Sequence, residues 1–205
     1  MVVIHYTAMA SAAAACDTLC NPATQVSAHY LIAQDGTVLS LVPEDLRAWH
    51  AGAGRWGAVT DVNSHSIGIE LANDGVSPFA APLMDALEDL LRAMMPRWHI
   101  PPARVIGHSD MAPQRKIDPG PRFDWRRLAL QGLSVWPDAG QADPAGFAAG
   151  MRAFGYTATD DPDLLLQCFR LRFRPWARGP LDGTDAGLIA DLARRFPVDA
   201  GGQAA

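Results

Sequence analysis

Short apolar runs and one long periodic segment divide the first two thirds of the chain. Leu83, Leu87 and Leu91 recur at four-residue intervals, which predicts a long helix over residues 81–98 with one stripe facing the core. Two further segments predict shorter helices, residues 8–19 and 124–130. Five runs rich in β-branched or aromatic residues have the length of strands: residues 2–6, 29–32, 38–42, 66–71 and 105–107.

The order of these elements predicts the fold class. Gln34-Asp35-Gly36-Thr37 separates two of the runs, and Asp-Gly between apolar segments is typical of an antiparallel hairpin. The remaining strands alternate with helices, as in α/β proteins. We therefore expect a mixed central β-sheet flanked by helices.

The chain changes character after Gln131. Glycine and proline cluster over the next dozen residues, which indicates a connection between two folded units. Three helical segments follow, at residues 144–154, 161–173 and 184–195, enough for a small three-helix domain. The predicted organisation is a first domain over residues 1–137, a linker over 138–143 and a helical domain over 144–205.

Composition excludes two classes of function. The net charge is -5 and the 17 basic residues form no long run, so a nucleic-acid partner is not expected. No stretch reaches the roughly 18 apolar residues that a membrane span requires, so no transmembrane segment is expected. The densest basic stretch contains Arg170, Arg172 and Arg174, and we expect it to form a solvated face without a catalytic role.

The three cysteines give some indication of the compartment. Cys16 and Cys20 on one helix would hold their Cβ atoms about 5–6 Å apart, farther than an unstrained disulfide allows. Together with Cys168 they are expected to be reduced thiols, which favours a cytoplasmic location. Residues 1–16 lack the basic start of a secretion signal. A signal segment upstream of the sequence given would instead favour the periplasm.

Three polar residues follow or end predicted strands and could converge on a metal ion. His5, His108 and Asp118 would supply two imidazoles and one carboxylate, the three protein ligands typical of catalytic zinc with a fourth position for water. Their spacing alone leaves other ligands open, namely Asp110, His29, His50 and His65.

Six segments along the chain form an ordered set of motifs: Val3-Ile4-His5-Tyr6-Thr7 and residues 26–32, 48–52, 66–71, 107–113 and 115–121. In this order they resemble the zinc-dependent N-acetylmuramoyl-L-alanine amidases, a superfamily that also contains phage amidases and animal peptidoglycan-recognition proteins. The resemblance covers residues 1 to about 137. It implies an enzyme that hydrolyses the amide bond between N-acetylmuramic, or 1,6-anhydro-N-acetylmuramic, acid and L-alanine in peptidoglycan fragments.

The same resemblance implies a role for individual residues. His5, His108 and Asp118 match the family's zinc ligands. Glu70 matches the glutamate that moves a proton from water to the leaving nitrogen, and Lys116 matches the lysine that stabilises the oxyanion. From the residues alone, Glu70 could instead be a solvent-facing strand carboxylate, and Lys116 a surface lysine paired with a neighbouring carboxylate.

The chain departs from some relatives at one position, where Ala28 replaces a tyrosine used in catalysis, so the catalytic prediction rests on Glu70. Trp49 and His50 match a segment near the family's cleft, where they could bind substrate or orient the loop. The predicted substrate contacts are Tyr6, Trp49, His50, Asn63 and Arg115.

Residues 165–175 and 181–185 resemble a three-helix peptidoglycan-binding module found in one branch of these amidases; the alternative is a helical appendage that packs on the amidase core. We expect the enzyme to recycle soluble anhydromuropeptides, with trimming of periplasmic wall fragments as the alternative. A non-catalytic peptidoglycan-binding protein would lack a ligand, and none is missing. A thiol hydrolase using Cys16 or Cys20 would need a Cys-His arrangement that the sequence lacks.

Overall fold

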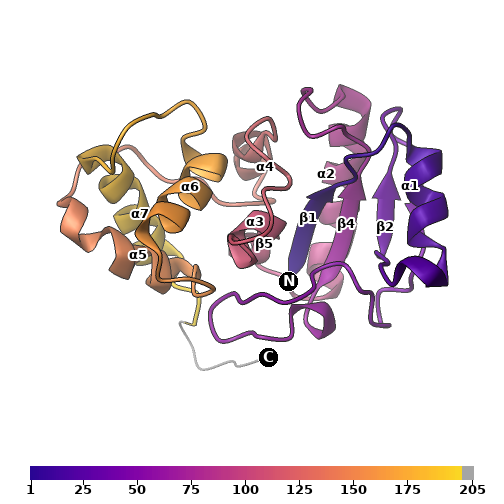
Figure 1. Cartoon of the computed structure of the whole chain (residues 1–205). Coiled ribbons are helices and arrows are strands. Elements are labelled where there is room, and N and C mark those ends of the chain that lie inside the picture. The colour runs from indigo at the N-terminus through magenta and orange to yellow at the C-terminus, as the bar shows by residue number, and fades with distance from the viewer. Residues whose placement is uncertain (200–205) are drawn as a thin grey trace.

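A five-stranded sheet organises the computed structural model, which describes residues 1–199 (Figure 1). The strand order is β3-β2-β4-β1-β5, with β2, β4, β1 and β5 parallel and β3 antiparallel to β2. The predicted α/β class with a mixed sheet is confirmed. The strands are β1 (Val2–Tyr6), β2 (Tyr30–Ile32), β3 (Val38–Ser40), β4 (Ile67–Leu71) and β5 (Val105–Gly107).

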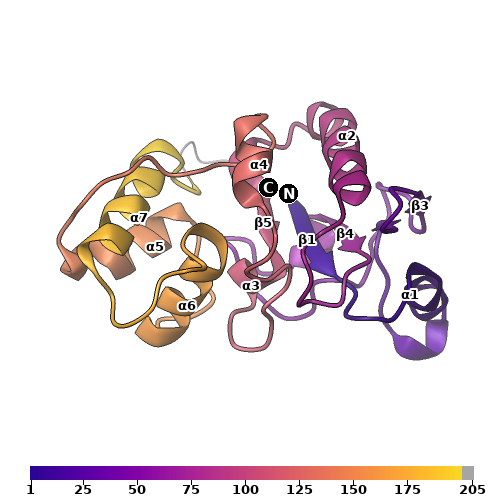
Figure 2. The same ribbon diagram turned by 90° about the horizontal axis from the view of Figure 1, so that it is seen from above.

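Helices cover both faces of this sheet and extend beyond its β5 edge (Figures 1 and 2). One face carries α2 (Ala81–Arg97) and α4 (Trp125–Leu130), and the other carries α1 (Ala12–Leu19) and α3 (His108–Met111). Beyond β5 lies a helical unit of α5 (Phe147–Phe154), α6 (Pro162–Phe173) and α7 (Gly183–Arg195). Short 3-10 helices span Pro22–Thr24, Val62–Ser64, Pro102–Arg104 and Pro144–Gly146.

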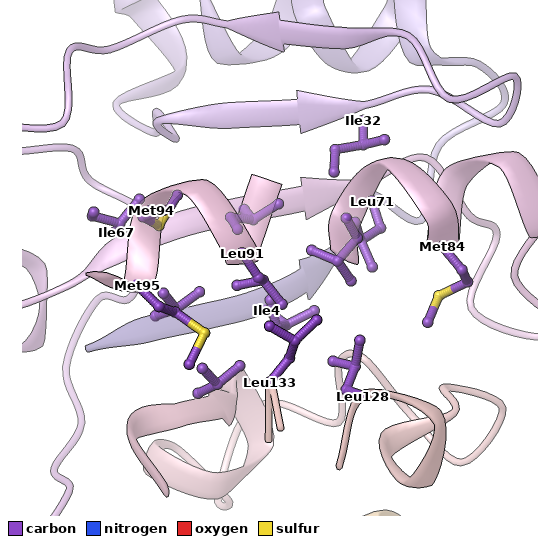
Figure 3. Packing of buried hydrophobic residues seen from close by; sticks show 14 of the residues in the cluster. Ile4, Ile32, Ile67, Leu71, Met84, Leu91, Met94, Met95, Leu128 and Leu133 are labelled. Carbon is purple, nitrogen blue, oxygen red and sulfur yellow. The ribbon is translucent and has the colours of Figure 1, made fainter. Parts of the chain in front are cut away.

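The predicted stripe of α2 packs directly on the sheet. Leu83, Leu87 and Leu91 are fully buried and belong to the same apolar cluster as Ile4 of β1. In Figure 3, Leu91 lies beside Ile4, and Leu128 of α4 lies at the lower edge of the cluster. The periodicity of the sequence therefore identified this half of the core correctly.

The opposite face continues into the helical unit. Side chains alternate between faces along a strand, so Val3 and Ile106 point away from α2. They share one apolar cluster with Met111 of α3, Phe154 of α5 and Phe169 of α6. This cluster contains residues from both sides of the predicted linker 138–143, so the helical unit packs on the body of the protein. The division at 137 and 143 stays a prediction, and residues 200–205 of the predicted helical domain lie outside the described residues.

Helix α1 is shorter than predicted. It begins at Ala12 rather than at Ala8, because the Ser11 hydroxyl accepts the Ala14 N–H and caps the helix. Ala8 has φ 50°, in the left-handed region, and cannot belong to the same helix. Helix α3 was not predicted, since a single turn of four residues leaves no periodic pattern.

The predicted solvated arginine face is wrong. Arg170 and Arg172 are buried, and Arg174 is largely covered. Arg170 pairs with Asp185 at 2.5 Å, and Arg172 pairs with Asp110 at 2.6 Å. Buried arginines need such partners because an unpaired charge is costly away from water. The partners lie at least 15 residues away in sequence, so local charge patterning did not reveal them.

The cysteines are free thiols, as expected. The sulfur atoms of Cys16 and Cys20 lie 4.0 Å apart near the end of α1, while Cys168 is buried in α6. Among residues 1–199, no helix combines the length and the apolar character needed to cross a membrane.

Candidate metal centre and active site

Strands β1 and β4 end side by side, and each carries a chemically active side chain. His5 and Glu70 are register partners in this parallel pair, so both point to the same face of the sheet, opposite to α2. The carboxyl ends of parallel strands are where α/β sheets place their ligands. The local strand patterns thus bring an imidazole and a carboxyl to one edge of the sheet.

His108 and Asp118 complete a compact group with His5. His108 follows β5 directly, and its Nδ1 lies 2.9 Å from Nδ1 of His5. Oδ2 of Asp118 lies 3.0 Å from both nitrogens. The Ser109 N–H donates to the Asp118 carbonyl at 2.9 Å, which ties the Asp118 loop to α3. On its far side, the His108 ring donates its Nε2–H to the Ala51 carbonyl at 2.9 Å.

A chain of hydrogen bonds assigns the tautomer of His5. The Ser66 hydroxyl donates to the Val62 carbonyl at 2.5 Å, so its oxygen accepts the Nε2–H of His50 at 3.3 Å. Nδ1 of His50 then accepts the Nε2–H of His5 at 3.0 Å. Gly68 makes room for this arrangement, because a Cβ at that position would overlap the His50 ring. His5 is left with an unprotonated Nδ1.

The three converging atoms therefore all present lone pairs. Nδ1 of His5 and of His108 and the Asp118 carboxylate meet in a buried position, and burial, with His108 nearby, lowers the pKa of His5 to about 4. Three electron-rich atoms at such short range are stabilised by a shared cation. Two neutral imidazoles and one carboxylate match the donor set of catalytic zinc, and partners on the far side of each ring are typical of metal-ligating histidines. The residues fit a metal ion.

Glu70 and Lys116 adjoin this group with uncommitted polar atoms. Oε2 of Glu70 is buried and has no hydrogen-bond partner among residues 1–199. Burial, followed by the charge of Asp118, raises the pKa of Glu70 to about 8, against the lowering influence of Lys116. Lys116 is the one lysine of the sequence, and its ammonium makes no hydrogen bond or ion pair within the described residues. Such groups are available for proton transfer and charge stabilisation.

An open cavity of about 380 Å³ joins these groups to solvent. Tyr6, Trp49 and Arg115, three of the predicted substrate contacts, line it. Trp49 is 56% exposed, and the Arg47 guanidinium lies 4.3 Å from the centre of its ring. The Arg115 guanidinium donates to the Ala53 carbonyl at 3.0 Å, so Arg115 holds the loop around Ala53 in addition to lining the cavity.

His50 and Asn63 have positioning contacts. His50 lines the cavity but is held between His5 and Ser66. Asn63 does not line the cavity: its Oδ1 accepts the N–H groups of His50 and Ala51 at 3.1 and 2.8 Å. The structure thus places Asn63 beneath the loop that carries Trp49 and His50, and does not bring it to the predicted substrate surface.

Three of the four competing ligands make other contacts, and the fourth, His50, is held between His5 and Ser66. Both ring nitrogens of His29 are occupied, by the Gly68 N–H at 2.9 Å and the Leu46 carbonyl at 3.0 Å. His65 is exposed and bonds to a backbone carbonyl. Asp110 is fully engaged in an ion pair and hydrogen bonds toward the helical unit. None of the three contributes to the group that could hold a metal.

Sequence reasoning missed Ser66, whose hydroxyl fixes the tautomers of His50 and, through it, of His5. The residue carries no periodic signal, because its effect passes through two other side chains. Its place at the start of the segment 66–71 was the available indication.

A parallel sheet edge with three metal-capable ligands, an uncommitted carboxyl and an uncommitted ammonium around one cavity has the components of a metal-assisted hydrolase. A family model described as N-acetylmuramoyl-L-alanine amidase matches residues 1–121. The chain belongs to this family of amidases. The predicted enzyme class, an amidase acting on muropeptides, is thereby confirmed at the level of the family.

Individual relatives support the same assignment. The chain is 36% identical to N-acetylmuramoyl-L-alanine amidase AmiD of Escherichia coli over 239 residues, covering 97% of this chain and 84% of AmiD. It is 41% identical over 103 residues to 1,6-anhydro-N-acetylmuramyl-L-alanine amidase AmpD of Enterobacter cloacae, covering 50% of this chain and 55% of AmpD. The E. coli AmiD structure with the substrate anhydro-N-acetylmuramic acid-L-Ala-D-γ-Glu-L-Lys matches with TM-score 0.87 and 32% identity, covering 96% of this chain and 89% of that one.

Proposed function

We propose that the chain is a zinc-dependent amidase that hydrolyses the bond between N-acetylmuramic acid and L-alanine in peptidoglycan fragments. His5, His108 and Asp118 hold the zinc ion, and Glu70 and Lys116 act beside it. The observation that carries the proposal is the convergence of three lone pairs within 3.0 Å, next to a buried carboxyl oxygen without a partner.

Zinc in this position supplies a Lewis acid that polarises the scissile carbonyl and makes water more acidic. Glu70 accepts the proton of the attacking water and returns it to the alanine nitrogen. The Lys116 ammonium stabilises the negative charge that develops on the carbonyl oxygen. Tyr6, Trp49 and Arg115 line the walls against which the substrate lies.

Metal removal tests this proposal directly. Purified protein incubated with an anhydromuropeptide should release free L-alanyl peptide, detected by mass spectrometry. Chelation should abolish the release, and added zinc should restore it. Asp118→Ala should lose both bound zinc and activity. Turnover that survives complete removal of the metal would contradict the mechanism.

We further propose that soluble anhydromuropeptides are the preferred substrates, in peptidoglycan recycling. Two similarities support this: the AmiD structure holds an anhydromuramyl peptide, and AmpD is named for such substrates. A cytoplasmic setting, favoured by the free thiols, stays a prediction, with the periplasm as its alternative. Rates on anhydromuropeptides, reducing muropeptides and intact sacculi would distinguish the settings, since a periplasmic trimming enzyme should act on sacculi.

For residues 144–205 we propose a peptidoglycan-binding role in addition. Between α4 and the helical unit lies a groove of about 1470 Å³, whose lining includes Arg122, Arg126 and Trp176. Trp176 is 68% exposed, and exposed aromatic rings are common contacts for ligands. Trp176→Ala should weaken co-sedimentation with sacculi. Trp98→Ala, an exposed tryptophan outside this groove, is the matched control. Equal binding by both variants and the wild type would contradict the role.

A further inference from the structure

Helix α3, which begins with His108, is a single turn of four residues. A turn this short is not stable by itself, because helix nucleation is unfavourable until more hydrogen bonds form. Its orientation, and with it that of the His108 ring, must be set by its surroundings. Those surroundings include α6 and the segment after α5, which belong to the helical unit.

Asp110, within α3, is the centre of these contacts. Its Oδ2 accepts the Gly107 N–H at 2.8 Å and a guanidinium N–H of Arg172 at 2.6 Å. Its Oδ1 accepts the Tyr156 hydroxyl at 2.6 Å. The side chains of Asp110 and Arg172 are 1% exposed. The carboxylate thus connects the residue preceding His108 to two side chains of the helical unit.

Arg172 reaches further around the metal ligand. Its second amino group donates to the Val105 carbonyl of β5 at 3.0 Å and to the Ser134 hydroxyl at 3.2 Å. Its guanidinium stacks 4.2 Å from the centre of the Trp125 ring. The Cys168 thiol, also on α6, donates to the Ser109 carbonyl at 3.4 Å. Helix α6 therefore holds the chain on both sides of His108.

We infer that Arg172 and Tyr156 are positioning residues for the metal ligand His108, so that the helical unit completes the metal centre of the amidase. This inference rests on the proposed zinc site. Neither side chain lines the catalytic cavity; both act through Asp110 and the backbone around His108. A helical unit with this role affects the reaction independently of any contact with glycan.

The experiment compares two buried arginines on the same helix. Arg172→Lys keeps the charge but cannot make all contacts of the guanidinium. Arg170→Lys is the matched control, because within residues 1–199 the Arg170 guanidinium bonds only to Asp185 and to the carbonyls of Gly179 and Pro180, all in the helical unit. The measured quantity is the zinc dissociation constant of the metal-free protein, from competition with a chromophoric chelator, alongside its thermal unfolding.

Outer partners of metal ligands contribute on the order of 10- to 100-fold to metal affinity. We therefore expect the zinc dissociation constant to rise by about 10-fold or more in Arg172→Lys, and by a smaller factor in Tyr156→Phe. Arg170→Lys should lower the unfolding temperature but change the dissociation constant by less than about twofold. Tyr156→Phe retains the ring that packs against Trp56 and decides the matter if Arg172→Lys fails to fold.

Two results would overturn the inference. One is wild-type zinc affinity in folded Tyr156→Phe and Arg172→Lys. The other is an equal loss of affinity in Arg170→Lys, because a general loss of stability would then explain the effect. Failure of the proposed zinc site is distinguishable: in that case the wild type binds no zinc, or His108→Ala binds it as tightly as the wild type.

Discussion

Two clusters of buried polar groups, one around His108 and one around Asp110, differ in how their atoms are paired. In the cluster around Asp110, a carboxylate meets a guanidinium, a phenol and a backbone N–H, and each oxygen has a donor. In the cluster around His108, two imidazole lone pairs and the Asp118 carboxylate face one another, and the neighbouring Glu70 retains a buried oxygen without a partner.

The difference separates a structural cluster from a chemical one. Buried carboxylates that serve stability have their oxygens satisfied within the protein, and in the cluster around Asp110 the one atom without a partner among residues 1–199 is Nε of Arg172, whose guanidinium lies over the Trp125 ring. Groups that serve a ligand or a reaction keep unsatisfied atoms, and the rest of the fold must offset their cost. Burial alone does not distinguish His108 from Asp110, since both are almost inaccessible. The two residues are distinguished by the hydrogen-bond partners of their side-chain atoms.

The largest effect should come from Glu70→Gln, which keeps the shape of the side chain but removes its capacity to carry a proton. We expect kcat to fall by about 10³-fold, within the range typical of general acid–base groups, with zinc still bound. The measurement is the rate of release of L-alanyl peptide together with the metal content.

Glu88→Gln sharpens the test, because Glu88 is a buried carboxylate that is paired with Arg127 and Arg92 on α2's side of the sheet. It should lower the unfolding temperature and leave kcat within about twofold. A similar loss of kcat in both variants would show that an unpartnered buried carboxyl is no more important for the reaction than a paired one. Loss of zinc from Glu70→Gln would instead make Glu70 a ligand.

Lys116→Met should have the next largest effect. Removal of one group that stabilises an oxyanion typically costs about 10²- to 10³-fold, and we expect a loss of kcat/KM near the lower end. Reductive methylation of the wild type alters this single lysine and the α-amino group but keeps the charge, so its loss should be smaller. An unchanged kcat/KM in Lys116→Met would show that the Lys116 ammonium does not stabilise the oxyanion.

Two aspartate variants compare the clusters by stability. Asp110→Asn leaves Arg172 without its counter-charge and should destabilise the metal-free protein by about 3 kcal/mol, as is usual for breaking a buried pair. Asp118→Asn removes the negative charge from the group of facing lone pairs and supplies an amide N–H that can donate to one of them, so the metal-free protein should lose less than about 1 kcal/mol. Denaturant unfolding with chelator present measures both. The reverse ranking would show that the group around Asp118 is also structural.

The smallest effect is expected from the cysteines. Cys16→Ser and Cys20→Ser, alone or combined, should leave kcat/KM within about twofold, since no nucleophilic thiol enters the mechanism. Cys168 should resist alkylation in the folded protein, because burial, with Asp110 nearby, raises the pKa of its thiol far above the usual range. A large loss of activity in the double variant would revive a thiol mechanism.

The sequence predicted what depends on local pattern. The stripe of α2 and the Asp35-Gly36 hairpin have their signal within a few residues, and both are confirmed. The convergence of His5, His108 and Asp118 depends on which strands are neighbours, so spacing alone left several ligands open. Similarity to a known family selected among them, and the structure brings those three residues together.

What the sequence concealed depends on partners distant along the chain. Arg172 looked like part of a solvated face, because the ion pair with Asp110 and the carbonyl of Val105 lie more than 60 residues away. Asn63 looked like a cleft residue, because no pattern distinguishes an amide that contacts substrate from one that holds a loop. Both of these errors concerned a polar side chain, whereas the apolar stripe of α2 was predicted correctly.

The position of β1 between β4 and β5 affects how the protein is made. Its parallel neighbours β4 and β5 lie about 65 and 103 residues later in the chain, by register from Val2 to Ile67 and Val105. During translation, Val2, Val3 and Ile4 therefore have no hydrogen-bonded neighbour in the sheet until β4 is made about 65 residues later, and β5 follows only after that. Such delayed, long-range pairing is slow and exposes apolar strand surface. Newly made chains should depend on chaperones more than the finished enzyme's stability suggests.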